Sequence, residues 1–303
     1  MRQVAPDLED FARTQVRDAL GSDNAITHLA VMQAGDEQSV LQLTLSRPPK
    51  RLILKVARPG TPAGVDFERS AAVSALARAA GVPTPGVLAA KISNRGDGWS
   101  YLLQERVHGV EWRQVRPLLD PDQVRAAHRQ IATALLAIQS IRFASFGELN
   151  AAGEVAGNGL VTALRRRAEI RITDAGRRTL FVDVLERDAD LFVDQVPILC
   201  HDDLHHANVI FRRDGGRWRL AAVLDWDKAW AGPAESDLAR MAFWDDMTGA
   251  GFWEVYDAAI TPAHGRAERA LVYQLLWCLE YPASTPRHRA DTAAVCRRLG
   301  VEM

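Results

Sequence analysis

The sequence predicts an α+β protein of two lobes, an N-terminal antiparallel sheet with one helix followed by a mainly helical C-terminal lobe. Short apolar runs of strand-forming residues, separated by turn residues, occupy most of residues 26–107. After residue 121, apolar residues recur mainly at helical spacing. A chain of 303 residues with 48% hydrophobic composition can bury a sizeable core, and its length suits one large domain or two lobes that share a cleft.

The N-terminal half begins with an expected helix at about Leu8–Leu20 and contains a second from Asp66 to Ala80. The second helix ends at Gly81 with Pro83 just beyond, a combination that commonly stops helices. Strands are expected at residues 26–57, with turns at 34–36 and 46–49, and at residues 86–92 and 99–107. The run 51–57 is apolar except for Lys55, so this lysine needs an explanation.

The C-terminal half is expected to contain helices at residues 121–140, 161–172 and 178–192. Two short apolar strands, 196–200 and 220–224, each run into polar residues, and a hairpin turn at 214–216 lies between them. This order of elements predicts two lobes, an N-terminal lobe at 1–108 and a helical lobe at 109–303, joined by a hinge at about 104–109.

Charge and cysteine content exclude several classes of protein. The formal net charge of -1 provides no basic surface for nucleic acid. No uncharged apolar stretch reaches the roughly 18 residues that a membrane-spanning helix needs. Cys200, Cys278 and Cys296 are widely spaced, which favours neither a disulfide framework nor a thiolate zinc site. We therefore expect a cytoplasmic protein, a monomer or weak dimer, without nucleic acid or membrane as a partner.

The segment from His201 to Asn208, His-Asp-Asp-Leu-His-His-Ala-Asn, carries the strongest chemical signal. Asp203 and Asn208 leave a strand on one short loop, so both side chains can face one point. An aspartate there can accept the proton of an attacking hydroxyl, and an asparagine can offer Mg²⁺ an oxygen ligand. Asp225 ends the apolar run 220–224 and can supply a second ligand. A zinc site built from the three histidines of the loop is the less favoured interpretation.

This segment is similar to the catalytic loop His-Gly-Asp-Leu-His-x-x-Asn of the aminoglycoside phosphotransferase and choline kinase family, small-molecule kinases with a protein-kinase-like fold. The similarity spans Cys200–Ala239, which also contains a family-like Asp-Trp pair and the sequence Ser-Asp-Leu-Ala. It implies that Asp203 is the catalytic base, that Asn208 and Asp225 bind Mg²⁺, and that His201 supports the loop.

Two aspartates of this region have other interpretations. We interpret Asp237 as a structural brace of the catalytic loop, although a helix N-cap is as compatible with its position. Asp202 stands where the family has glycine. Its carboxylate could contact substrate, alter the geometry of the loop or face solvent.

The N-terminal half adds the residues expected for the nucleotide. Lys55 on a strand and Glu68 on the following helix match the ion pair that positions ATP phosphates in kinases. By the same resemblance, residues 101–109 form the hinge. Adenine would hydrogen-bond the Glu105 carbonyl and the Val107 amide there, next to Gln104. The turn at 34–39, which ends at Ser39, would cover the phosphates.

The stretch 225–246 is acidic and rich in aromatic residues, which fits either a solvated helix face or a cation-attracting acceptor pocket. The candidate acceptor residues are Asp202, His206, Asp227, Trp230, Asp245, Asp246 and Glu280. The rings available for stacking are Trp226, Trp230, Phe243, Trp244, Trp253 and Trp277, most of which we expect in the core.

The sequence therefore predicts an ATP-dependent and Mg²⁺-dependent phosphotransferase, with GTP as an alternative donor. Its acceptor would be a hydroxyl of a small polar or cationic molecule, most often an antibiotic in proteins with this resemblance. A metabolic kinase of choline, a sugar, homoserine or a nucleoside-like compound is the alternative within the same chemistry. A nucleotide-binding pseudokinase and an HD-type metal phosphohydrolase are the alternatives outside it.

Overall fold

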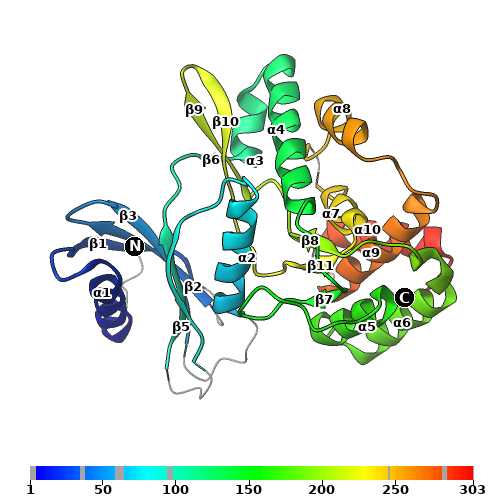
Figure 1. Ribbon diagram of the computed structural model, residues 1–303, viewed down its shortest axis with the longest axis horizontal. Coiled ribbons are helices and arrows are strands. Elements are labelled where there is room, and N and C mark those ends of the chain that lie inside the picture. The colour runs from blue at the N-terminus through cyan, green and yellow to red at the C-terminus, as the bar shows by residue number, and fades with distance from the viewer. Residues whose placement is uncertain are drawn as a thin grey trace.

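Two lobes make up the structure, a computed structural model that describes residues 5–34, 38–58, 65–93, 98–244, 246–281 and 285–302 (Figure 1). The N-terminal lobe holds a five-stranded antiparallel sheet of order β1-β2-β3-β5-β4. Its elements are α1 (Pro6–Leu20), β1 (Ile26–Ala34), β2 (Gln38–Leu45), β3 (Arg51–Ala57), α2 (Phe67–Ala79), β4 (Val87–Lys91) and β5 (Ser100–Glu105).

Strand β3 shows how alternation divides this sheet between two environments. Leu52, Leu54 and Val56 point to a core that α1 covers, whereas Lys55 lies on the opposite face. Helix α2 lies between the sheet and the C-terminal lobe (Figure 1). Its buried residue Val73 joins the core of that lobe. The alternation therefore directs Lys55 toward the junction of the lobes.

The C-terminal lobe is mainly helical. Its helices are α3 (Trp112–Val115), α4 (Pro121–Gln139), α5 (Leu160–Arg171), α6 (Ala175–Arg187), α7 (Ala234–Met241), α8 (Ala250–Ala259), α9 (Arg266–Glu280) and α10 (Pro286–Leu299), with 3₁₀ turns η1 (Arg116–Leu118) and η2 (Ala189–Phe192). Two small sheets accompany them, β10-β9-β6 and β7-β11-β8. Their strands are β6 (Val110–Glu111), β7 (Gly147–Glu148), β8 (Ile198–Cys200), β9 (Val209–Asp214), β10 (Arg217–Val223) and β11 (Trp230–Gly232).

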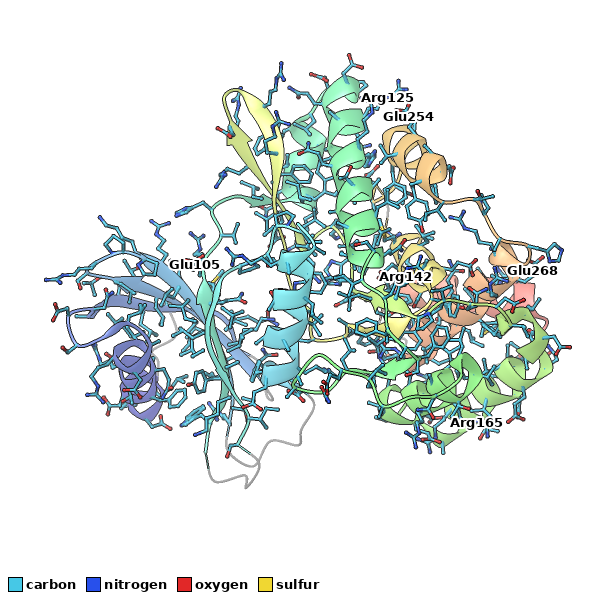
Figure 2. The ribbon with its side chains drawn as sticks, viewed as in Figure 1. Glu105, Arg125, Arg142, Arg165, Glu254 and Glu268 are labelled. Carbon is cyan, nitrogen blue, oxygen red and sulfur yellow. The ribbon has the colours of Figure 1, made fainter. Side chains whose placement is uncertain are left out.

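Helix α4 is the central element of this lobe, and its beginning is encoded locally. Asp120 and Gln123 form a capping box around Pro121, which satisfies the free N–H groups of the first turn. On the exposed side, Arg125 and Arg129, one turn apart, both bind Glu254 of α8; Figure 2 labels Arg125 and Glu254. One core lies beneath α4 and α8, and a second lies among α5, α6, α9 and α10.

The structure confirms the predicted α+β fold with an antiparallel N-terminal sheet and a helical C-terminal lobe. The helix expected at 178–192 is α6 followed by η2, because the chain departs from helical geometry at Asp188. The short strands β6, β7 and β11 escape prediction, since two or three residues carry no periodic pattern. Residues 35–37 of the expected phosphate-covering turn lie outside the described residues. None of the described helices is long and apolar enough to cross a membrane.

Candidate active site

The loop of residues 201–208 leaves β8, a strand whose three residues are all buried. His201 is fully buried, and its Nε2 lies 2.9 Å from the carbonyl oxygen of Leu224. The Nδ1 atom of the same ring accepts a 3.2 Å hydrogen bond from the backbone N–H of Asp203. Burial lowers the pKa of His201, so the ring stays neutral. His201 thus fastens the loop to the end of β10.

Asn208 and Asp225 come together because β9 and β10 form a hairpin. The backbone N–H of Leu224 donates to the carbonyl of Asn208 at 2.8 Å, which places Asp225 beside this asparagine. The amide nitrogen of Asn208 donates to the carbonyl of Asp203 at 3.0 Å, and its amide oxygen has no partner among the described residues. Two oxygen-bearing side chains therefore face the same space.

A cavity of about 370 Å³ opens between the lobes at this point. Its walls come from β2, β3, the segment 104–111, and the ends of β9 and β10, as the lining residues Val40, Ile53, Lys55, Gln104, Glu105, Val107, Gly109, Asn208, Ile210, Leu224 and Asp225 show. The expected hinge residues thus lie at this cavity. Ser39 and Glu68 do not line it.

Lys55 forms ion pairs with two carboxylates across the lobe junction. Its Nζ lies 2.7 Å from Asp225 and 3.4 Å from Asp227. Burial acts to lower the pKa of Lys55, but Asp227 and Asp225 outweigh it and raise the pKa above its ordinary value. Burial acts to raise the pKa of Asp225, but Lys55 outweighs it and lowers the pKa to about 2. Lys55 and Asp225 are therefore both charged.

The ion pair expected between Lys55 and Glu68 is not formed among the described residues. Instead, Asp227 occupies the position next to the lysine, where the Ser70 hydroxyl of α2 donates to it at 2.7 Å. Burial, with the nearby charge of Asp225 adding to it, raises the pKa of Asp227. The link between α2 and the lysine thus runs through Ser70 and Asp227.

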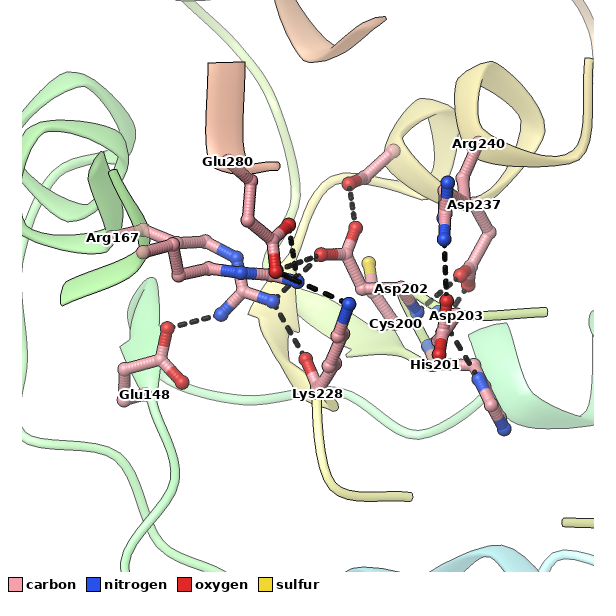
Figure 3. A network of polar contacts seen from close by, with 12 residues as sticks. Glu148, Arg167, Cys200, His201, Asp202, Asp203, Lys228, Asp237, Arg240 and Glu280 are labelled. Carbon is pink, nitrogen blue, oxygen red and sulfur yellow. Dashed lines mark hydrogen bonds and ion pairs between the residues drawn. The ribbon is translucent and has the colours of Figure 1, made fainter. Parts of the chain in front are cut away.

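Asp202 turns away from the lobe junction into a buried ion network (Figure 3). Its carboxylate lies 2.7 Å from Arg167 and 2.6 Å from Arg171, both of α5, and accepts a 2.8 Å hydrogen bond from Ser236. Despite burial, Arg167 and Arg171 hold the pKa of Asp202 well below its usual range. The backbone of Asp202 has φ +56°, a left-handed conformation that suits the glycine of related loops and that aspartate tolerates.

Further members extend this network on both sides (Figure 3). Arg167 also binds Glu148 of β7 and donates to the carbonyl of Lys228 at 2.6 Å. Arg171 binds Glu280 at the end of α9 at 2.8 Å, and Lys228 lies 3.1 Å from the same carboxylate. The network therefore joins the loop of residues 201–208 to α5 and α9.

Asp237 braces the same loop from α7. Its two carboxylate oxygens accept hydrogen bonds from the backbone N–H groups of His201 at 3.1 Å and of Asp202 at 2.7 Å. Burial raises the pKa of Asp237 to about 7, against the effect of these two donors. These contacts hold the backbone on which Asp203 stands.

The carboxylate of Asp203 lies among cations. Arg240 of α7 donates to it at 2.6 Å, and the His205 ring lies 4.0 Å away. Burial acts to raise the pKa of Asp203, but Lys228 and Arg240 outweigh it and lower the pKa. Burial lowers the pKa of His205 to about 4, so this ring is neutral near pH 7. Asp203 is therefore an ionised carboxylate that can orient a hydroxyl group.

A second cavity, of about 450 Å³, lies on the other side of Asp203. The remaining lining residues are His205, Arg240, Phe243, Trp244, Trp277, Tyr281, Thr285, Arg287, His288 and Asp291. The sequence named several of these rings only as available for stacking. It missed the residues from Tyr281 onward, because they follow the catalytic loop by some eighty positions and belong to no motif.

The structure corrects several of the acceptor residues expected from sequence. Trp230 is 1% exposed and lies beneath Arg167, so no acceptor reaches its ring. Asp202 and Glu280 are committed to the buried network. Asp227 pairs with Lys55 at the lobe junction. These side chains stabilise the fold around the site.

Three further acceptor candidates have different outcomes. The Asp246 carboxylate pairs with Arg116 at 2.8 Å and does not line the aromatic cavity. His206 contacts Trp244 edge-on, with 4.8 Å between ring centroids. Asp245 lies outside the described residues.

The residues at the lobe junction fit a bound Mg²⁺. Asn208 presents a free amide oxygen, and Asp225 an ionised carboxylate, to one cavity. Two such ligands suit Mg²⁺, which completes its shell with waters and phosphate oxygens. The described residues contain no cluster of three or more His, Cys, Asp or Glu side chains able to hold a metal by themselves.

A family model described as the phosphotransferase enzyme family matches residues 29–271 of the sequence. The chain belongs to this family. The match includes Lys55, the loop of residues 201–208 and Asp225. It confirms the resemblance stated from the sequence, and the protein is a small-molecule kinase. No curated protein sequence matches the chain.

Solved structures share the fold over nearly the whole chain. Aminoglycoside phosphotransferase APH(4)-Ia is 19% identical with a TM-score of 0.67, over 98% of this chain and 97% of that chain. The streptomycin-ATP-APH(2″)-IIa complex is 15% identical with a TM-score of 0.60, over 100% of both chains. The ethanolamine kinase of Plasmodium vivax is 12% identical with a TM-score of 0.60, over 97% of this chain and 89% of that chain. These likenesses confirm the two-lobed kinase fold.

Proposed function

We propose that this kinase transfers the γ-phosphoryl group of ATP to a hydroxyl group of a small molecule, with Asp203 as catalytic base. One observation carries the proposal. Asp203 lines the aromatic cavity, Asn208 lines the lobe-junction cavity, and the amide of Asn208 donates to the carbonyl of Asp203. The acceptor and the nucleotide can therefore meet across one hydrogen-bonded pair of residues.

In this reaction the acceptor oxygen attacks the γ-phosphorus, the bond from phosphorus to the bridging oxygen breaks, and ADP leaves. The hydroxyl proton passes to the carboxylate of Asp203. Because the pKa of Asp203 is lowered, this carboxylate stays ionised and orients the hydroxyl before transfer. Lys55 lines the nucleotide cavity, which supports a role for its ammonium group in binding phosphate oxygens.

Asn208 and Asp225 would hold Mg²⁺, which when bound neutralises developing negative charge on the phosphates. Gln104, Glu105 and Val107 also line this cavity, and the backbone of the last two can hydrogen-bond a base there. One structural neighbour is a ternary complex with the ATP analogue AMP-PNP and hygromycin B, which supports ATP as donor. GTP is the alternative donor, because backbone contacts do not specify the base.

Neighbours that bind hygromycin B and streptomycin favour an antibiotic as the acceptor. The ethanolamine kinase neighbour favours a metabolic alcohol as the second candidate. The cation-attracting pocket expected from the acidic stretch has no support, since Asp227 and Glu280 are paired with cations. We propose a protein of the cytoplasm that acts without nucleic acid or membrane.

The test compares Asp203→Ala with the wild type in acceptor-dependent ADP release and in ATP binding by calorimetry. We expect the variant to lose at least about 10²-fold in turnover, because general base catalysis contributes that much, while its affinity for ATP changes little. The control is Asp214→Ala, which removes an exposed carboxylate of the β9–β10 hairpin. Wild-type turnover in Asp203→Ala would refute the assignment, and ATP binding without any phosphoryl transfer would indicate a pseudokinase.

A further inference from the structure

The aromatic cavity beside Asp203 has a composition that restricts its ligand. Phe243, Trp244, Trp277 and Tyr281 give it four aromatic rings within about 450 Å³. The Phe243 and Trp277 rings stack with centroids 4.3 Å apart, so they form a continuous apolar wall. Such walls bind molecules that present a ring or another flat apolar face.

The charges of the cavity do not favour a cationic ligand. Its described carboxylates are Asp203 and Asp291, and each has an arginine partner within the lining, Arg240 at 2.6 Å and Arg287 at 3.7 Å. The guanidinium of Arg240 also stacks on Trp277 at 4.3 Å, so this ring face already holds a cation. An ammonium group entering here would lose hydration without gaining an unpaired carboxylate among the described residues.

We infer that the acceptor of this kinase is a ring-bearing hydroxyl compound without an ammonium group. The inference rests on the proposed function and narrows it, because it excludes polycationic antibiotics and amino alcohols as the preferred acceptors. Within the cavity, the ring contacts the aromatic lining and the reacting hydroxyl meets Asp203.

A matched pair of probes tests the charge preference. Chloramphenicol has a nitrophenyl ring, two hydroxyl groups and an uncharged amide, whereas its deacylated base keeps the ring and hydroxyls but exposes an ammonium group. Equilibrium binding to the wild type is measured by calorimetry, with hygromycin B as a polycation. We expect chloramphenicol to bind at least about tenfold more tightly than either. Equal affinity, tighter binding of a cation, or no binding of chloramphenicol overturns the inference.

Thr285 offers a test that locates the ligand. It lines the cavity and caps α10, where its side chain accepts from the backbone N–H of His288. Thr285→Asp keeps a good cap and adds a negative charge, and Thr285→Asn keeps the cap without charge. Relative to Thr285→Asn, we expect Thr285→Asp to tighten binding of the chloramphenicol base about fivefold, in line with about 1 kcal/mol for a partly exposed ion pair. An unchanged ratio means that the ligand binds elsewhere and refutes the location.

The ring contact has its own variant. Trp277→Leu is expected to weaken chloramphenicol binding about tenfold or more, while Trp253→Leu on α8, outside the cavity, leaves it unchanged. ATP binding separates this inference from the proposed function. If the protein binds ATP and phosphorylates hygromycin B in preference to chloramphenicol, only the inferred class of acceptor is refuted. If the protein binds no ATP, the proposed function itself is refuted.

Discussion

Replacing Asp202 by asparagine removes one charge from a buried network and preserves most of its shape. Asparagine tolerates the left-handed backbone of this position, φ +56°, and can keep the hydrogen bond from Ser236. Removing one partner of a buried ion pair costs about 3–5 kcal/mol. Arg167 keeps Glu148 and Arg171 keeps Glu280, so we expect the lower end, about 3 kcal/mol of unfolding free energy.

Two further substitutions at this position separate the charge from the backbone. Asp202→Gly loses the charge and the Ser236 hydrogen bond, about 1 kcal/mol, but gains about 1 kcal/mol because glycine adopts positive φ freely. Asp202→Ala loses the same contacts without that gain. We therefore expect asparagine and glycine variants of similar stability and an alanine variant about 1–2 kcal/mol less stable.

The pH dependence gives a second measurement of the same charge. The folded-state pKa of Asp202 lies well below its ordinary value of 3.8, so the stabilisation from its charge is present above that pH and is lost as the pH falls through the folded-state pKa. Because the charge of Asp202 also raises the pKa of Asp237, the stability advantage of the wild type over Asp202→Asn should grow as the pH falls from about 8 to 5, and it should shrink below about pH 4.

Urea unfolding followed by tryptophan fluorescence measures these differences, because seven of the eight tryptophans lie after the hinge. Asp214→Asn on the exposed hairpin is the control, with an expected change below about 0.5 kcal/mol. If Asp202→Asn at pH 7 is within about 1 kcal/mol of the wild type, the buried network does not stabilise the loop as reasoned.

Three other predictions concern the nucleotide site, a buried ion pair and the hinge. Asp225→Ala should lower Mg²⁺-dependent ATP affinity at least about tenfold in calorimetry, and equal affinity with and without Mg²⁺ in the wild type would contradict its role. Arg269 binds Glu235 through two 2.6 Å contacts, so Arg269→Met leaves this carboxylate without its partner and should lower the unfolding free energy by about 3 kcal/mol in urea titration. A change under about 1 kcal/mol would be inconsistent with burial of the pair. Gly109→Ala places a Cβ 2.6 Å from the Phe211 carbonyl oxygen and should cost about 1–3 kcal/mol and weaken ATP binding, so an unchanged melting temperature would argue against this close approach.

Much of the N-terminal lobe follows from local patterns. The alternation of β3 predicts both a strand and the exceptional position of Lys55 on its second face. Gly81 marks the end of α2, and the capping box at Asp120 marks the start of α4. These signals depend on neighbours in the sequence, so they can be read without the fold.

The partners of charged groups cannot be read in that way. Glu68 has the spacing of a kinase glutamate, yet Lys55 pairs with Asp225 and Asp227, which lie 170 and 172 residues away. Asp202 offered three interpretations from sequence, and the structure adds a different one, because the two arginines that bind it come from α5. Long-range pairing depends on which helices pack together, and no local pattern specifies it.

The sequence by itself determined the chemistry of this protein. The motif around Asp203, Asn208 and Asp225 predicted a small-molecule kinase, because catalysis of phosphoryl transfer needs few groups at defined short intervals. Only the tertiary structure decided the lining of the aromatic cavity, since Trp277 and Tyr281 reach Asp203 through the packing of α7, α9 and α10. A cavity has no sequence spacing of its own, because its walls are whatever side chains the packed helices leave facing one another.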